Sequence, residues 1–596
     1  MRSPLRRHIW SGAAFLGLSL TAMGVGPRCA AQSSPVQRAK PEKNRLAVSE
    51  YVGSTACSQC HRSIYSSYVR TEMGRSMRTP DQAFLATVPT SASVFDARFN
   101  RYFEVRLRSG SLYQGEYGRT DDGQETFREE AKVEWIIGAG ANGLGAITRR
   151  GDFLFEAPLS YYSNVKKWEL SPGYEYGDYG FSRPILAGCI VCHSGRPRRS
   201  SENEARFAEP PFAELAIGCE NCHGPGSAHV FEKQANLPPR SGSSSIVNPA
   251  RLTPWLADNI CMMCHQTGQA RVLQTGKQYS DFRPGEELDK TLSIFQIPFG
   301  RTEPPKDDLL EHYLSMRLSK CYRMSDGKLS CITCHDPHIQ PSEQEAPAYF
   351  RTRCLGCHTE ASCAAGDALR QATLPPDNCI TCHMPKRDLA TISHSALTNH
   401  RIVATADEPF PAEAFQMTSA ALPDLVHLSA APGEKETTPP LVLLQAYRQA
   451  MQVDPAYRQQ YWKLGEQLAA SHPNDLGVLQ GLTDLSLQRG DKEGLQSAIE
   501  HLGKAVDKPD AQMADFMLLA RLYASSGRLE DSAKTLRQGM IRFPYAPNLY
   551  RFLGKAYLSM GQNAEACSIL SRAATLFPQY DDFRSQSKDC GRPAGP

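Results

Sequence analysis

The sequence predicts a multidomain protein: an irregular and helical domain carries a β-rich insertion and is followed by a helical solenoid. Three observations lead to this fold class. One short cysteine motif occurs seven times, the stretch between the first two motifs alternates apolar and polar residues, and the C-terminal part repeats with a period of 34 residues. A chain of 596 residues is long enough for about two to four domains. Lys and Arg (66) nearly balance Asp and Glu (63), so no nucleic-acid partner is expected.

The N-terminus has the pattern of a secretory signal. The basic residues Arg2, Arg6 and Arg7 precede an apolar run, and small residues lead to a predicted cleavage site near Ala31. A retained membrane anchor is the alternative, but the run is short and is interrupted by Ser and Gly. We therefore expect residues 1–31 to be removed from a periplasmic or exported protein, whose mature chain has no membrane span.

The pattern Cys-x-x-Cys-His recurs seven times and uses fourteen of the nineteen cysteines. Two thioethers can hold one edge of a porphyrin, and the adjacent histidine then provides the proximal nitrogen ligand of the iron. Zinc also uses Cys-x-x-Cys, but it would pair two such motifs and would not need a histidine after each one. The motifs therefore predict seven covalent c-type haems. The attachment cysteines are Cys57, Cys60, Cys189, Cys192, Cys219, Cys222, Cys261, Cys264, Cys331, Cys334, Cys354, Cys357, Cys379 and Cys382, and the proximal ligands are His61, His193, His223, His265, His335, His358 and His383.

The composition of residues 45–405 fits a domain packed around haem. Long apolar helical faces are few, while Gly, Pro and Arg are frequent. Large flat porphyrins can supply core volume that side chains do not. We therefore predict a mostly irregular and α-helical multihaem domain over 45–405, which does not fold without haem.

The second axial ligands are fewer than the irons. A six-coordinate c-type haem needs a distal ligand, usually His or Met. Eight histidines lie outside the motifs in the mature chain, and three of them fall in the linker or the solenoid. Five histidines for seven irons leave at least one iron with Met, another group or no distal ligand. The candidate distal histidines are His229, His312, His338, His394 and His400.

The segment after His61 is predicted to be helical as far as Gly74. Met73 and Met77 are four residues apart, so they would share one face if the helix continued. Either could present a thioether to the first iron, or could instead be flexible filler against the porphyrin.

Several extended motifs resemble those of exported multihaem cytochromes c related to the tetrahaem nitrification cytochromes. They are CENCHGPGSAH, KCYRMSDGKLSCITCHDPH, CITCHMPKRD and HSALTNHRI. The chain looks most like bacterial proteins that join such a domain to tetratricopeptide repeats. In this group the helix after the first motif often carries a distal histidine in Ser-x-His-Ala, and Met73 stands at that place here. The related pentahaem nitrite reductases use Cys-x-x-Cys-Lys at the catalytic iron, and this sequence contains no such motif.

The residue pattern of 93–182 is typical of β-strands. The stretch RYFEVRLRSGSLYQGEY alternates around Ser109–Gly110, which is a hairpin signal, and KVEWII and GDFLFEAPLSYY continue the pattern. We therefore expect a β-rich insertion between the first and second motifs.

A Pro- and Ala-rich stretch over residues 406–440 predicts a linker, and repeats follow it over 441–585. Phe516, Leu519, Tyr523, Gly527 and Pro544 recur 34 residues later as Tyr550, Leu553, Tyr557, Gly561 and Pro578. This is the tetratricopeptide pattern, whose concave face can dock a protein partner. A spacer or stabilising cap is the alternative. Two disulfides are also expected, Cys567–Cys590 in the repeats and Cys321–Cys363 in the haem domain.

Three functions remain open. The closely spaced motifs favour electron transfer along packed haems, in exchange with redox partner proteins. The ligand shortfall permits an oxidoreductase that acts on a small nitrogen or sulfur compound at one five-coordinate haem. In the third, the repeats carry the main function and the haem domain tethers a larger complex.

Overall fold

A computed structural model describes residues 50–200, 205–237, 245–300, 311–389, 394–415, 424–431 and 438–590. The predicted signal segment 1–31 lies outside the described residues. From Ser49 onward the chain forms one compact unit. Within the described ranges, no helix is both long and apolar enough to cross a membrane.

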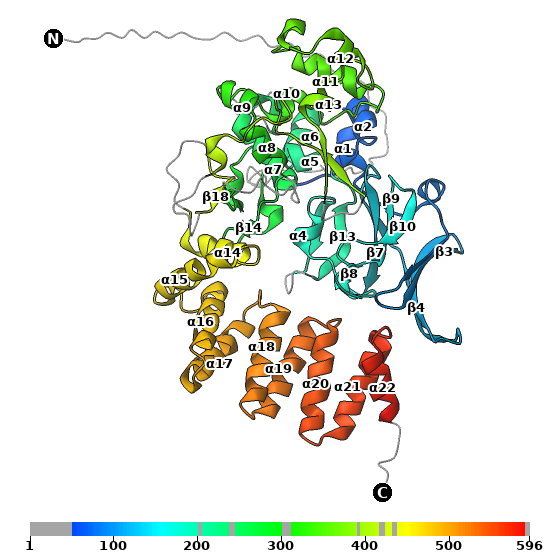
Figure 1. Cartoon of the computed structure of the whole chain (residues 1–596), viewed down its shortest axis with the longest axis vertical. Coiled ribbons are helices and arrows are strands. Elements are labelled where there is room, and N and C mark those ends of the chain that lie inside the picture. Colours follow the sequence, from blue (N-terminus) through cyan, green and yellow to red (C-terminus); the bar gives the residue numbers. More distant parts are fainter. Residues whose placement is uncertain are drawn as a thin grey trace, which may run out of the picture. The chain divides into compact units, whose positions relative to one another are not determined.

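The seven motifs lie on short helices or at helix ends (Figure 1). The longest of these helices is α7 (Pro254–His265). Its start has a clear cause, because the Thr253 hydroxyl accepts the Leu256 N–H at 3.4 Å and Pro254 needs no N–H partner in the first turn. The other motif helices are α1 (Ser54–Ser58), α4 (Ala187–Ile190), α5 (Glu220–His223), α10 (Cys331–Cys334), α11 (Ala346–Cys354) and α13 (Cys379–His383); between them lie α2 (Arg62–Tyr68), α6 (Ser227–Gln234), α8 (His312–Leu318), α9 (Lys320–Met324) and α12 (Asp367–Gln371).

The segment after the first motif differs from the predicted helix. Helix α2 ends at Tyr68, a 3-10 turn covers Met73–Arg75, and Met77 begins strand β1 (Met77–Arg78). The chain folds back tightly here, since a Cβ added to Gly74 would lie 2.3 Å from the carbonyl oxygen of Tyr68. Met77 is 2% exposed within an apolar cluster, so the expectation that it shares a helical face with Met73 is wrong.

The β-rich region is present and extends beyond its predicted end. One sheet is the antiparallel meander β2 (Ala92–Asp96), β3 (Arg101–Arg108), β4 (Ser111–Arg119) and β5 (Glu125–Lys132). Ser109 and Gly110 both have positive φ (49° and 76°), as a tight two-residue hairpin turn requires. The second, seven-stranded sheet contains β1, β6 (Trp135–Ile137), β7 (Gly143–Arg150), β8 (Phe153–Glu156), β9 (Leu159–Tyr162), β10 (Lys167–Leu170) and β11 (Arg183–Pro184), and the pair β12 (Gly195–Arg199) and β13 (Phe207–Glu214) follows.

Part of the predicted linker belongs to a folded sheet. Strand β18 (Val426–His427) pairs with β15 (Leu292–Gln296), which in turn pairs with β14 (Ala270–Leu273). Leu428, next to β18, is fully buried. The Pro- and Ala-rich composition concealed this short apolar strand, so the expectation of a simple linker over 406–440 is corrected.

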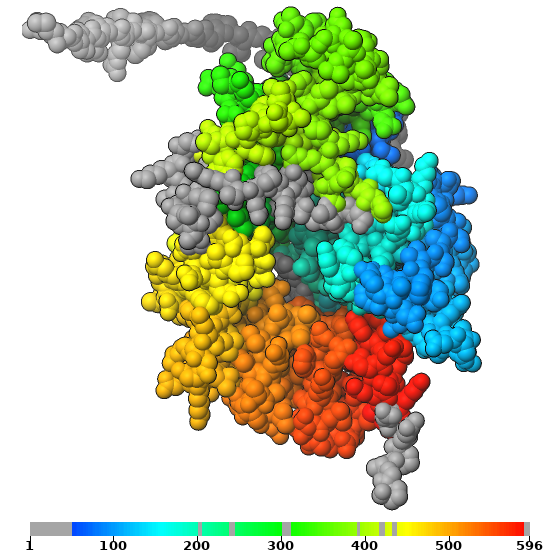
Figure 2. Space-filling model, viewed as in Figure 1, coloured from blue at the N-terminus to red at the C-terminus, as the bar shows by residue number. Residues whose placement is uncertain are grey.

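The C-terminal part is a series of antiparallel helices. Helices α18 (Met513–Ser525) and α20 (Pro547–Ser559) begin 34 residues apart, as do α19 (Leu529–Arg542) and α21 (Asn563–Leu576), which confirms the predicted period. These helices lie side by side in chain order (Figure 1), and their surfaces form one continuous region (Figure 2). The remaining helices are α14 (Pro440–Ala450), α15 (Arg458–Ala469), α16 (Leu476–Arg489), α17 (Lys492–Val506) and α22 (Asp581–Asp589).

One of the two expected disulfides is present. Cys567 and Cys590 are bonded, with their Cα atoms 5.4 Å apart, and this bond joins α21 to the end of α22. Cys321 and Cys363 are not bonded to each other, so the pairing expected in the haem domain is wrong. Burial raises the pKa of the Cys321 thiol, and the motif cysteine Cys357 adds a smaller electrostatic contribution in the same direction.

Candidate haem-binding sites

Four of the seven motif histidines lie opposite a second histidine. The ring centroids of His61 and His229 are 6.4 Å apart, with 19° between the ring planes. Those of His223 and His338 are 5.9 Å apart, at 21°.

The other two pairs come from the fourth and fifth motifs. The centroids of His265 and His312 are 5.4 Å apart at 72°, and those of His335 and His400 are 6.1 Å apart at 30°. Metal–nitrogen bonds of about 2 Å on both sides of one ion place the centroids of two trans imidazoles about 6 Å apart. Three of the separations match this distance, and that of His265 and His312 is about half an ångström shorter.

In three of the histidine rings, the Nδ1 nitrogen is hydrogen-bonded to a backbone carbonyl. The Nδ1 atoms of His223, His383 and His400 contact the backbone carbonyls of Val247 at 2.8 Å, Val403 at 2.6 Å and Thr398 at 3.0 Å. A carbonyl oxygen can only accept, so each Nδ1 carries the proton and each Nε2 keeps its lone pair. Metal-binding histidines show this arrangement, in which a backbone or carboxylate partner fixes the ring.

The rings are held in the neutral form that binds metals. Burial, with smaller contributions from neighbouring imidazoles, lowers the pKa of His312 to about 2 and that of His400 to about 4. His193 and His265 have exposed side chains, yet the surrounding protein desolvates both rings and lowers their pKa.

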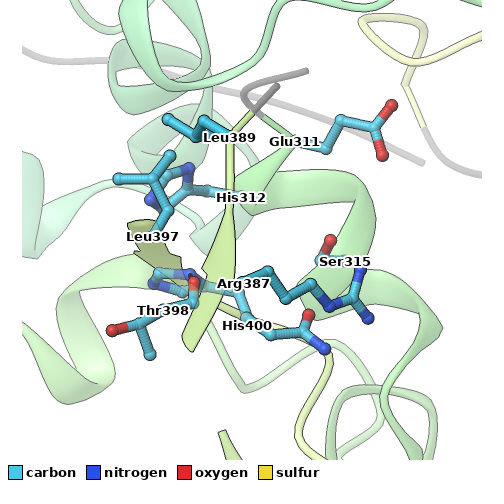
Figure 3. A pocket seen from close by; sticks show the side chains of 9 residues that line it. Glu311, His312, Ser315, Arg387, Leu389, Leu397, Thr398 and His400 are labelled. Carbon is cyan, nitrogen blue, oxygen red and sulfur yellow. Dashed lines mark hydrogen bonds between the residues drawn. The ribbon is translucent and has the colours of Figure 1, made fainter. Parts of the chain in front are cut away.

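A small pocket lies beside two of the paired histidines. It has a volume of about 40 Å³ and lies between α8 and the hairpin β16 (Lys386–Asp388) and β17 (Ala396–Thr398). His312 and His400 line it with their ring centroids 4.2 Å apart. Figure 3 shows both imidazoles on the same side of the pocket and the carboxylate of Glu311 directed away from them. A space of this size holds about one water molecule.

The attachment cysteines also meet one another. Neighbouring motif thiols shift one another's titration: Cys219 raises the pKa of Cys57, Cys264 lowers the pKa of Cys192, and Cys261 raises the pKa of Cys331. None of the fourteen motif cysteines, all of them described, is in a disulfide. In the described part of the chain, no group of three or more His, Cys, Asp and Glu side chains could by itself hold a metal ion.

Two of the predicted distal ligands are not in the expected place. The Nε2 atom of His394 lies 2.8 Å from a carboxylate oxygen of Glu169, and its ring meets Tyr162 edge-on, in the β-rich region. His229 lies opposite His61, which disfavours Met73 as the partner of that ring. No ring contact joins His193, His358 or His383 to a second imidazole among the described residues.

Sequence reasoning missed a buried carboxylate that brings the first pair together. Glu220, the second residue of the third motif, is 3% exposed. It accepts the N–H groups of Val52 at 3.0 Å, Gly53 at 2.7 Å and Gly226 at 2.7 Å. It thus holds the segment before the first motif against the start of α6, the helix that carries His229. An acidic residue inside an attachment motif was the only available signal.

No family model and no curated protein matches the chain. Similar solved structures include a thermophilic TPR protein of Thermus thermophilus, 22% identical over 26% of this chain and 81% of that chain, with a TM-score of 0.20. MamA is 16% identical over 24% and 81% of the two chains (TM-score 0.20). The Cut9–Hcn1 hetero-tetramer is 19% identical over 26% and 30% (TM-score 0.21). Each of these likenesses covers about a quarter of this chain.

Proposed function

We propose that the protein is an exported heptahaem c-type cytochrome that transfers electrons along its haems. The observation that carries this proposal is the set of four histidine pairs, each of which contains the histidine of one Cys-x-x-Cys-His motif. Ring separations of 5.4–6.4 Å suit an iron between two imidazoles.

In this proposal the chain's own residues hold and tune the haems. Each Cys-x-x-Cys pair would hold a haem through two thioethers, and the adjacent histidine would provide its Nε2 atom as a ligand of the iron. The carbonyls of Val247 and Val403 fix the rings of His223 and His383. A bound haem supplies a one-electron iron couple, whose potential depends on the axial ligands, burial and neighbouring charges.

The TPR-like helices are proposed to dock a redox partner protein. Solenoids of this kind present a continuous surface built from successive repeats, which suits recognition of another protein. The N-terminal signal pattern supports export to the periplasm, where cysteines meet an oxidising environment and covalent attachment protects them from disulfide formation.

A second candidate function is reduction or oxidation of a small nitrogen or sulfur compound. The observation that favours it is that His193, His358 and His383 face no second imidazole among the described residues. An iron held by one of them would keep a position for substrate if no other group filled it.

Haem counting and electron paramagnetic resonance test both candidates. We expect the mature protein to carry seven covalent haems by mass spectrometry, and the variant with Cys57→Ala and Cys60→Ala to carry one fewer. An electron carrier will show only low-spin ferric haems and no spectral change with nitrite, hydroxylamine or sulfite. Fewer than six covalent haems contradicts the main proposal, and a high-spin signal that these compounds alter favours the oxidoreductase.

A further inference from the structure

The fourth attachment motif and its helix α7 contact two other motifs. The sulfur of Cys192 in the second motif lies 3.9 Å from the backbone carbonyl oxygen of Met263, the residue before Cys264, and the backbone N–H of Cys331 in the fifth motif donates to Asp258 of α7 at 2.9 Å. Cys192, Cys264 and Cys331 also pack against one apolar cluster. Because each thiol anchors the edge of one porphyrin, haems attached here would be direct neighbours. The fourth motif is therefore a junction between the second and the fifth.

A positive charge lies on the second-motif side of this junction. The Arg271 guanidinium donates to the backbone carbonyls of Met263, at 2.8 Å, and Gln266. The Met263 carbonyl is also 3.9 Å from the sulfur of Cys192, so Arg271 and Cys192 meet at the same carbonyl. The guanidinium acts electrostatically on the thiols of both Cys192 and Cys264. Strand β14 holds Arg271 in this position through its pairing with β15.

A negative charge lies on the fifth-motif side. Asp258 is on α7, three residues before Cys261, and is 2% exposed. Its Oδ1 atom accepts the backbone N–H of Cys331 at 2.9 Å, and its carboxylate acts on the Cys331 thiol as well. The helix therefore places this carboxylate beside Cys261 of the fourth motif and Cys331 of the fifth.

We propose that Arg271 and Asp258 direct electrons across the fourth motif, from the haem at Cys331–His335 toward the haem at Cys189–His193. This inference rests on the proposed electron-transfer function. A nearby positive charge stabilises the reduced state of a haem, and a nearby negative charge destabilises it. Both groups lie in a partly or fully buried setting, where charges are weakly screened. Together they favour an electron on the second haem over the fifth, and the second haem is one whose histidine has no imidazole opposite it among the described residues.

The test is a redox titration followed by electron paramagnetic resonance in the full-length haem protein. It is run at pH 8, where the Asp258 carboxyl, whose pKa burial raises to about 6, is ionised. The second haem is identified by its loss in the variant with Cys189→Ala and Cys192→Ala. We expect Arg271→Gln to lower its potential and Asp258→Asn to raise that of the fifth haem. Each change should reduce the preference of an electron for the second haem about tenfold, or about 59 mV for a one-electron couple.

Matched variants separate charge from structure. Arg271→Lys keeps the charge and should leave the potentials near those of the wild type. Lys277→Gln and Glu286→Gln remove exposed charges on the same stretch of chain and should do the same. Asp258→Asn keeps an oxygen that can accept the Cys331 N–H. If it nevertheless loses a haem, the comparison of Arg271→Gln with Arg271→Lys decides the question.

Two different failures can be told apart. If the variants keep seven haems and wild-type potentials, the directing role of Arg271 and Asp258 is overturned while the electron-transfer proposal stands. If the wild-type protein carries no covalent haem, the proposed function itself fails.

Discussion

At the scale of single residues, two side chains are candidates for the second axial ligand opposite His61. Met73 occupies the position where the resembling cytochromes often have a distal histidine. His229 comes from helix α6, which follows the third motif, and its ring centroid is 6.4 Å from that of His61. The geometry favours His229, which would give the first haem two histidines and a lower potential than a His/Met pair.

Substitution of the two residues distinguishes them. We expect His229→Ala to convert one of the low-spin ferric haems to high-spin in the electron paramagnetic resonance spectrum, because its iron loses a strong axial ligand. Met73→Ala should leave the low-spin count unchanged. Haem content by mass spectrometry is the control, since neither change touches an attachment cysteine. A high-spin signal in Met73→Ala alone would reverse the assignment.

The candidate site could be predicted from the sequence only in its local parts. The attachment residues lie within five positions of one another, so their spacing alone defined them. The partner of His61 lies 168 residues further along the chain, and its approach depends on how Glu220 docks onto the N–H groups of Val52 and Gly53. No local pattern encodes such a contact. The contact of His394 with a glutamate of the β-rich region is long-range in the same way.

At the scale of elements, features set by neighbouring residues were predicted more reliably than features set by contacts between distant segments. The turn at Ser109–Gly110 and the 34-residue helix period depend on neighbouring residues, and both were predicted correctly. Strand β18 was missed because it is only two residues long and pairs with a strand far away in the sequence. Two residues do not form a recognisable strand pattern within a Pro- and Ala-rich stretch.

A half-buried ion pair between two strands gives an element-scale prediction. Glu156 in β8 lies opposite Arg183 in β11, with 2.8 Å between the carboxylate and the guanidinium. Burial raises the pKa of Glu156 to about 7, although Arg183 partly opposes this shift. The pKa is higher in the folded than in the unfolded state, so the stabilisation is complete below the unfolded value and is lost as pH rises toward 7.

The isosteric variant Glu156→Gln removes this titration. We expect its melting temperature, relative to the wild type, to be higher at pH 8 than at pH 4.5. The linked free energy is at most about 3 kcal/mol for a shift of this size. Circular dichroism melts of both proteins at the two pH values measure the difference. A constant difference across this range would mean that Glu156 is ionised throughout.

At the scale of the whole molecule, the two halves obtain their cores differently. The last repeats bury Leu549, Tyr550, Leu553 and Phe577 completely against one another. In the half that carries the seven motifs, the proposed haem-binding half, four motif histidines instead face a second imidazole at centroid distances of 5.4–6.4 Å. Helix α14 lies at the boundary, because Val442 packs on the sheet of β14 and β15 while Leu444 packs on the next helices.

This difference predicts how the full chain behaves without haem. We expect protein made in a host that lacks the haem-attachment machinery to lose the haem-binding half to limited proteolysis, because that half lacks its central packing material. The helices from α15 to α22 should survive as one fragment, since successive repeats bury their apolar faces against each other. Mass spectrometry of the digest identifies the fragment, and haem-loaded protein, which should resist cleavage in both halves, is the control. Equal resistance of the haem-free chain would mean that side chains alone build the core around the seven motifs.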